Sequence, residues 1–69
     1  MLAELRRKAG KTQREVAEAL EVSEQAVRNW EKGRERPRFY VWQFFALAEL
    51  LGCSVYELPS YRKNSGDHN

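Results

Sequence analysis

The feature that most constrains the fold is the short spacing between two predicted helices. A Thr-x-x-Glu capping box begins at Thr12, and apolar residues at helical spacing after it predict a helix over 12–20. Ser23 is a good N-cap for a second helix over 23–31. Only residues 21–22 separate these two helices. Because that connection is too short for antiparallel packing, we expect the helices to cross steeply.

Apolar residues are spaced to fill the inside corner between these two helices. They are Val16, Ala17, Leu20, Val22, Val27 and Trp30. Ala17 supplies the small side chain that is needed where the helices touch. Two helices arranged in this way form a helix-turn-helix, which places the amino-terminal turn of its second helix in a major groove of DNA while the first helix crosses the backbone.

Polar residues lie on the predicted outer face of the second helix. The candidates for reading bases are Glu24, Gln25, Arg28 and Asn29. The amides of Gln25 and Asn29 suit adenine, Arg28 suits guanine, and a carboxylate can accept from cytosine N4. Any solvated helix would also place polar groups there, so the base-reading role depends on the helix-turn-helix context.

Apolar spacing predicts further helices on either side of this unit. One covers 2–9 and a longer one covers 40–51, and each is followed by a glycine that can end a helix. Ser54 can cap a last short helix, which Pro59 stops. The charged residues 32–38 are interpreted as a solvated loop. The predicted fold is therefore an all-α, five-helix domain.

The length of the chain limits what it can do. With 69 residues it forms one small domain, which we assign to residues 1–59, and we expect the polar residues 60–69 to be a disordered tail. A chain of this size buries only about 60% of the surface that its unfolded form exposes, which leaves no room for a deep catalytic cleft. We therefore do not expect an enzyme.

The sequence predicts neither a membrane span nor a metal site. No stretch approaches the roughly 18 apolar residues that span a bilayer, and the start of the chain lacks the basic-then-apolar order of a signal peptide. The single cysteine, Cys53, cannot form an internal disulfide and has only His68 as a nitrogen-ligand companion, too few for zinc. We interpret Cys53 as a core residue and expect no cofactor and no small-molecule ligand.

Positive charge is concentrated in the first half of the chain. The net charge is only +2, which barely favours nucleic acid over other partners. The cations of residues 28–38 are Arg28, Lys32, Arg34, Arg36 and Arg38. Such a run often only solvates a helix and a loop, and phosphate binding is the alternative interpretation.

Several short motifs together resemble the phage-repressor and Cro-like (XRE-type) helix-turn-helix family, which has a five-helix, lambda-repressor-like fold. The resemblance covers about residues 2–58. The motifs that carry it are Leu5-Arg6, Gly10-Lys11-Thr12-Gln13 into Val16-Ala17, Val22-Ser23-Glu24-Gln25-Ala26-Val27, Trp30-Glu31-Lys32-Gly33, Pro37, and Leu51-Gly52-Cys53-Ser54 through Leu58. Together these motifs are specific, whereas each alone is weak.

The resemblance implies roles for individual residues. It implies that Gln13 holds a phosphate and braces a residue of the second helix, here called the recognition helix. It also implies a structural ion pair between Arg6 and Glu31, which joins the first helix to the end of the recognition helix. The expected phosphate contacts are Thr12, Gln13, Ser23, Arg34, Arg36 and Arg38.

The sequence departs from the family pattern at two places. The turn position that commonly holds glycine is Glu21, and a positive φ there would cost about 1 kcal/mol relative to glycine. The chain between Pro37 and Gly52 is slightly longer than the usual family spacing, so that the helix over 40–51 is extended or its preceding loop is rearranged. This second departure bears on the dimer surface more than on the DNA-reading surface.

The segment after the loop carries more aromatic side chains than a core of this size needs. A helix can turn only part of such a set inward, so the other rings are either exposed or covered by a partner. Core filling explains Phe44. The candidates for a dimer contact are Phe39, Tyr40, Trp42 and Phe45.

These observations predict a homodimer that binds double-stranded DNA sequence-specifically and acts as a transcriptional repressor. The helix over 23–31 would read the major groove, and the expected location is the cytoplasm, at a bacterial or phage nucleoid. The alternative is a protein-interaction module of the same fold, which binds a toxin partner or a subunit of the transcription machinery. The chain is compatible with a whole regulator or with a fragment of a longer one.

Overall fold

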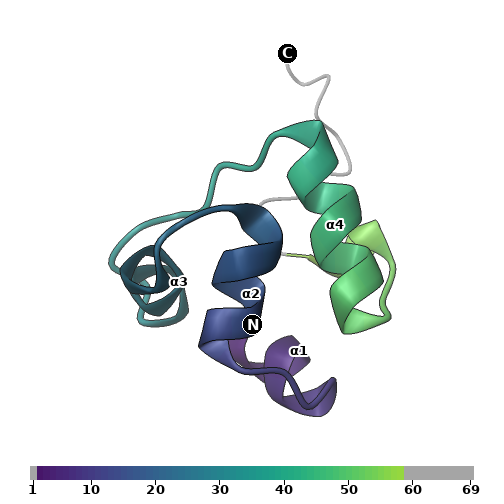
Figure 1. Ribbon diagram of the computed structural model, residues 1–69, viewed down its shortest axis with the longest axis horizontal. Helices are drawn as coiled ribbons and strands as arrows, with labels where there is room; N and C mark the ends of the chain where they lie inside the picture. Colours follow the sequence, from purple (N-terminus) through teal and green to yellow (C-terminus); the bar gives the residue numbers. More distant parts are fainter. Residues whose placement is uncertain (1, 59–69) are drawn as a thin grey trace.

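The computed structural model describes residues 2–58 of the chain. Within that range it contains four α-helices, one 3₁₀ turn and no strand (Figure 1). In chain order the elements are α1 (Leu2–Lys8), α2 (Gln13–Leu20), α3 (Glu24–Glu31), α4 (Val41–Leu51) and the 3₁₀ turn η1 (Val55–Glu57). The helical class agrees with the sequence prediction, and the predicted tail over 60–69 lies outside the described residues.

The predicted fifth helix is a single 3₁₀ turn instead of an α-helix. Ser54 caps it, since its hydroxyl oxygen accepts a 3.2 Å hydrogen bond from the backbone N–H of Tyr56. The turn ends at Leu58, whose backbone is extended with φ −81° and ψ 149°. The next residue in the sequence is Pro59, and a residue that precedes proline avoids the α conformation. A longer helix is therefore stopped before its second turn.

Local capping sets the starts of α2 and α3. The hydroxyl oxygen of Thr12 accepts from the backbone N–H of Glu15 at 3.0 Å, and the Glu15 carboxylate accepts from the backbone N–H of Thr12 at 2.8 Å. The hydroxyl oxygen of Ser23 accepts from the backbone N–H of Ala26 at 3.0 Å. These bonds satisfy backbone donors that have no partner inside a helix, as the sequence pattern predicts.

The turn between α2 and α3 is closed by a left-handed residue. Glu21 has φ 58° and ψ 43°, and the backbone N–H of Val22 donates to the carbonyl of Ala17 at 3.0 Å. This is the hydrogen-bond pattern of a helix end that usually contains glycine. The chain then changes direction sharply, and Figure 1 shows α3 nearly end-on while α2 lies in the plane of the view.

The core lies where α2 meets α3 and α4. Its buried apolar residues are Leu2, Val16, Ala17, Leu20, Val27, Leu47, Leu51 and Leu58. The small side chain of Ala17, on α2, is buried in this cluster. Cys53 packs against this cluster from a partly buried position, and that burial raises the pKa of its thiol.

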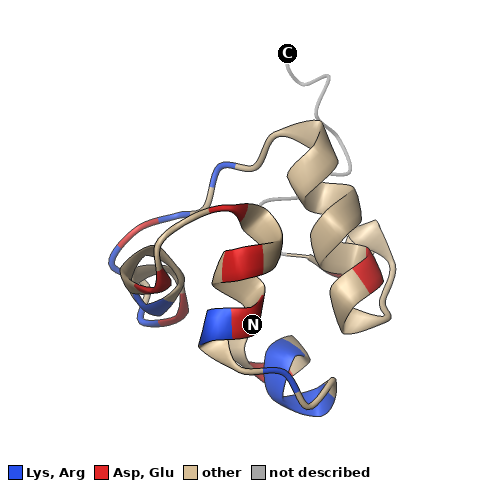
Figure 2. Cartoon of the chain, viewed as in Figure 1, with Lys and Arg blue, Asp and Glu red and all other residues tan. Residues whose placement is uncertain are grey.

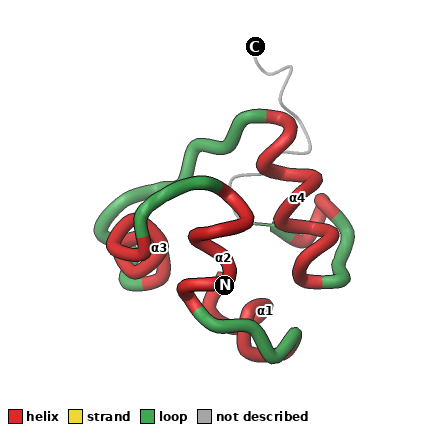
Figure 3. The backbone as a smooth tube through the Cα atoms, viewed as in Figure 1, coloured by secondary structure: helices red, strands yellow, loops and turns green. Residues whose placement is uncertain are grey.

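A chain of aromatic rings joins the end of α3 to α4 across the long segment that Figure 3 shows between them. The ring centroids of Trp30 and Phe39 are 5.3 Å apart, and those of Phe39 and Phe44 are 5.2 Å apart. Both pairs are edge-to-face, the geometry that the charge distribution of aromatic rings favours. The carboxyl-terminal end of α3 is therefore fastened to α4 by packing.

The helix α4 contains the buried polar residue Gln43, which sequence reasoning missed. Its side chain is only 7% exposed, its Nε2 donates to the carbonyl oxygen of Leu20 at 2.9 Å, and its Oε1 accepts from the backbone N–H of Tyr40 at 2.8 Å. The signal was available, because Gln43 lies four residues before Leu47 and therefore on the same inward side of the helix. In the described part of the chain, none of the helices is long and apolar enough to cross a membrane.

Candidate nucleic-acid interface

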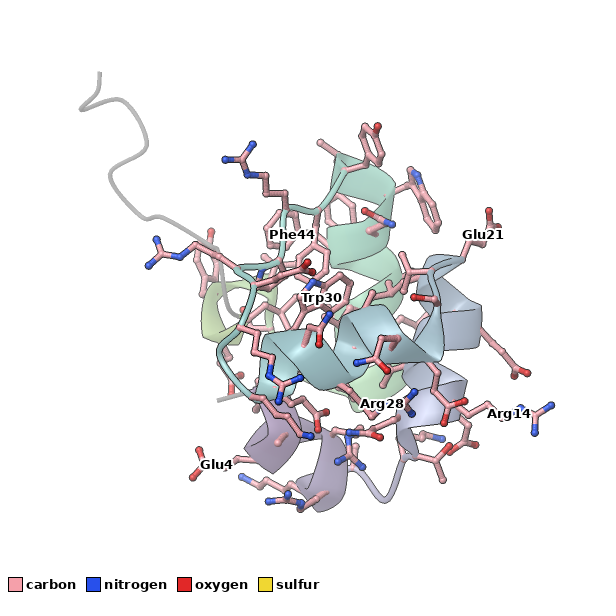
Figure 4. The ribbon with its side chains drawn as sticks, turned by 90° about the vertical axis from the view of Figure 1, so that its left-hand side faces the viewer. Glu4, Arg14, Glu21, Arg28, Trp30 and Phe44 are labelled. Carbon is pink, nitrogen blue, oxygen red and sulfur yellow. The ribbon has the colours of Figure 1, made fainter. Side chains whose placement is uncertain are left out.

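The four candidate base-reading residues lie together on the outer face of α3. Val27 is buried and Trp30 packs against the core, so the opposite side of the helix faces outward. Glu24 and Gln25 are exposed there, while Arg28 and Asn29 are partly exposed. Figure 4 shows the labelled Arg28 on the side of α3 that faces away from the core. The spacing of these residues, one turn apart, explains why they share a face.

The side chains on this outer face are linked to one another. The Gln25 carbonyl oxygen accepts from Nη2 of Arg28 at 3.1 Å, and its amide nitrogen donates to Oδ1 of Asn29 at 3.0 Å. Nη1 of Arg28 lies 3.6 Å from a carboxylate oxygen of Glu24. Gln25 is thus at the centre of the group and orients both neighbours. We call these four residues the α3 network.

The α3 network keeps hydrogen-bonding groups that can meet base edges. The guanidinium of Arg28 has five N–H donors, and its contacts with Gln25 and Glu24 engage only two of its three nitrogen atoms. The Asn29 amide uses its oxygen in the network, which leaves its NH₂ group as a donor. The Gln25 amide retains one N–H and one lone pair. Donors of this kind match the acceptor atoms of guanine and adenine in the major groove.

The end of α3 is held by an ion pair that the structure forms between Arg6 and Glu31. The guanidinium donates twice to the carboxylate, at 2.6 Å from Nε to Oε2 and at 3.1 Å from Nη2 to Oε1. The pair is nearly buried, with side chains 12% and 6% exposed. Arg6 also donates to the backbone carbonyl of Lys11 at 3.0 Å, so one side chain joins α1, the segment between α1 and α2, and the end of α3.

Gln13 is part of the same buried group. Its Nε2 donates to Oε1 of Glu31 at 2.9 Å, so it braces a residue of α3, the kind of role that the resemblance implies. The hydrogen bond from Arg6 is the main reason that the pKa of Glu31 lies below its ordinary value, and the bond from Gln13 acts in the same direction against the effect of burial. The carboxylate is therefore charged at neutral pH, and the pKa of Arg6 is raised by the same contact.

The residues expected to hold phosphates are distributed around α3. The hydroxyl oxygens of Thr12 and Ser23 accept capping bonds, which leaves each O–H as a donor. Arg34, Arg36 and Arg38 are exposed on the segment that follows α3. Figure 2 shows that Lys and Arg gather on this segment and on α1, whereas α4 is almost without charge.

The candidate dimer residues separate into two groups. The ring of Phe39 lies between Trp30 and Phe44 and packs against the core. Tyr40, Trp42 and Phe45 are exposed, and so is Val41, which sequence reasoning did not single out. Within residues 2–58, the structure holds no group of three or more His, Cys, Asp or Glu side chains that could bind a metal ion.

Comparison with known proteins places the chain in a family. The family model described as "Helix-turn-helix" matches residues 2–58, which is most of the chain and the same range that the structure describes. No curated protein and no solved structure matches the chain. The family model and the two capped helices with their short turn agree, and the chain therefore belongs to the XRE-type helix-turn-helix family of DNA-binding domains.

Proposed function

We propose that this protein is a transcriptional repressor that binds double-stranded DNA sequence-specifically as a homodimer. In this proposal α3 enters the major groove and the α3 network reads base edges. The observation that carries the proposal is the α3 network itself, four polar side chains that are held in one arrangement on the outer face of the second helix of a helix-turn-helix.

The way in which α3 is anchored supports this role. Base reading requires a side chain to be positioned within a fraction of an ångström, which needs a rigid supporting element. The Arg6–Glu31 pair and the bond from Gln13 hold the carboxyl-terminal end of α3, and the Trp30 ring packs it against Phe39. The face that meets DNA is therefore supported from behind by buried contacts.

The phosphate contacts are proposed on both sides of this helix. Thr12, Gln13 and Ser23 lie at the starts of α2 and α3, where backbone N–H groups and the helix dipole also favour an anion. Arg34 and Arg36 follow the end of α3 and are exposed. Contacts of this kind position a protein on the duplex, whereas base contacts select the sequence.

Two variants separate the two kinds of contact. Arg36→Ala should weaken binding to all duplexes about equally and reduce the slope of log K against log salt by about 0.9, because one phosphate contact is lost. Gln25→Ala should leave that slope almost unchanged and alter the preference among operator sequences. Each variant is the control for the other. A wild-type protein whose binding to DNA does not depend on salt would contradict the proposal.

The exposed aromatic side chains of α4 favour a second candidate function, a protein-interaction module of the same fold. Tyr40, Trp42 and Phe45 could bind an apolar surface of another protein. Binding driven by such rings is nearly insensitive to salt, whereas DNA binding is not. Titration of salt in the binding assay therefore distinguishes the two functions.

A further inference from the structure

An apolar patch covers the outward side of α4 near its amino-terminal end. It consists of Tyr40, Val41, Trp42 and Phe45, which are 73%, 71%, 46% and 62% exposed within the described part of the chain. We call these residues the α4 patch. The buried residues Gln43 and Leu47 lie on the other side of the same helix, facing the core. An α-helix that is apolar on both sides is typical of one that is covered on both sides.

Two opposite charges lie at the two sides of the α4 patch. Arg38 is exposed on the segment that leads into α4, two residues before Tyr40. Glu21 is exposed in the α2–α3 turn and follows Leu20, whose carbonyl is bound by Gln43 of α4. Figure 4 shows the segment that enters α4 on one side of the amino-terminal end of that helix and the labelled Glu21 on the other side.

We propose that the α4 patch is the surface through which two copies of this chain pair, with Arg38 of each copy opposite Glu21 of the other. This inference rests on the proposed function, which requires two recognition helices on one duplex. It assigns Arg38 to the interface in place of the phosphate contact that the sequence predicts.

Symmetry selects this arrangement. Figure 4 views the molecule with α3 facing the reader and the amino-terminal end of α4 at the upper edge. A two-fold axis along the line of sight adds a second copy above the first, with both α3 helices facing the same side, as one face of DNA requires. The same rotation exchanges left and right, so the segment that enters α4 in one copy, which contains Arg38, comes to the side on which Glu21 lies in the other copy. A horizontal two-fold axis in the plane of the view would instead leave left on the left. The segments that contain Arg38 would then lie opposite each other, and the two α3 helices would face opposite sides of the dimer.

The size of the patch indicates a weak dimer. Three partly exposed aromatic rings and a valine offer on the order of 400–500 Å² per copy, below the roughly 800 Å² per partner of a standard stable interface. Pairing is therefore expected in the micromolar range, and DNA with two half-sites about 34 Å apart would strengthen it by holding both copies close together.

Sedimentation of the full chain without DNA tests the surface. The wild type should shift from monomer to dimer as its concentration rises through the micromolar range. The double variant Trp42→Ala/Phe45→Ala should remain monomeric while it keeps a helical circular dichroism spectrum. A wild type that stays monomeric at high micromolar concentration, or a double variant that still dimerises, would overturn the proposal.

Charge exchange tests the orientation of the two copies. Glu21→Arg alone and Arg38→Glu alone should each weaken dimerisation about fivefold to tenfold, since each affects two symmetric ion pairs. The combined variant should restore most of that loss, and Glu4→Arg, on an exposed position of α1, is the matched control that should have no effect. If the combined variant is no better than the single ones, the proposed orientation is wrong.

The DNA assay separates this inference from the proposed function. A dimerisation-defective Trp42→Ala/Phe45→Ala protein should still bind a single half-site with the wild-type sequence preference, because α3 is unchanged. If the wild type also binds only single half-sites and never pairs, the dimer surface and the homodimer are wrong, while sequence-specific DNA binding by α3 stands. If neither protein binds duplex DNA, the proposed function itself fails.

Discussion

Gln43 of α4 donates a 2.9 Å hydrogen bond to the carbonyl oxygen of Leu20, the last residue of α2. A carbonyl at the end of a helix has no donor within that helix, so α4 supplies the missing partner. Leu20 immediately precedes the left-handed Glu21 that begins the α2–α3 turn. The carbonyl group next to the α2–α3 turn therefore receives its hydrogen bond from α4, a helix that does not belong to the helix-turn-helix.

Replacing Gln43 by leucine tests that contact. Gln43→Leu keeps a side chain of similar size but leaves the Leu20 carbonyl without its donor, so we expect a loss of about 1–3 kcal/mol in the free energy of unfolding. Glu49→Leu on the exposed side of α4 is the matched control and should change stability little. Chemical denaturation of both variants measures the difference, and equal stabilities would contradict a structural role for the bond.

The Arg6–Glu31 pair is expected to be a major source of stability. Removing one partner leaves the other nearly buried without its counter-charge, so Arg6→Ala or Glu31→Ala should cost about 3 kcal/mol. The double variant should lose less than the sum of the single losses, because no uncompensated charge remains. Thermal melts of the three variants provide the measurement. Small and strictly additive losses would show that the two side chains do not act as a pair.

The Arg6–Glu31 pair also predicts how the free energy of unfolding depends on pH. The pKa of Glu31 is held below its ordinary value of 4.5, mainly by the hydrogen bond from Arg6. The Glu31 carboxylate therefore takes up a proton at lower pH in the folded protein than in the unfolded chain. The contribution of Glu31 to the free energy of unfolding is complete above about pH 4.5, and it is lost as the pH falls through the lowered pKa.

A variant without this carboxylate isolates the effect. Glu31→Gln should be less stable at neutral pH and should lose less stability than the wild type on acidification below about pH 4.5. Glu49→Gln, at an exposed position of α4, is the matched control, and its acid profile should follow that of the wild type. Unfolding curves at several pH values provide the comparison, and parallel profiles for wild type and Glu31→Gln would argue against this origin of the acid sensitivity.

Glycine at position 21 should stabilise the protein. Glu21 has a positive φ of 58°, a conformation that costs a side chain about 1 kcal/mol relative to glycine. Glu21→Gly should therefore raise the melting temperature by about 4–8 °C at a protein concentration where the chain is monomeric. Glu21→Ala removes the charge but keeps the Cβ atom, so it should show little of this gain. An equal gain in both variants would assign the effect to the charge.

Local sequence signals were enough to predict the helix-turn-helix. The caps at Thr12 and Ser23 depend on residues only three positions away, and the structure forms both. The positive φ considered for Glu21 follows from the same short connection. These features are determined by neighbours in the chain, which is why a pattern of spacing can indicate them.

The features that were not predicted depend on residues distant in the chain or on the detailed arrangement of side chains. Gln43 was missed because its partner, the carbonyl of Leu20, becomes available only when α4 packs on α2. The last predicted helix has its expected place but is a 3₁₀ turn, because a cap at Ser54 marks only the start of a helical segment and does not distinguish the two kinds of helix. The bonds of Gln25 to its neighbours could not be inferred, since one outer face permits several arrangements of the same polar side chains.

The most direct test of the central claim is selection of bound sequences from a random duplex pool, performed with the wild type and with Gln25→Ala. The wild type should enrich an inverted repeat whose half-sites lie about 34 Å apart, with guanine or adenine preferred at the positions that the α3 network meets. Because Gln25 orients both Arg28 and Asn29, Gln25→Ala should relax the preference at more than one position of each half-site. A wild type that enriches no sequence, or a Gln25→Ala protein with an unchanged sequence profile, would contradict base reading by the α3 network.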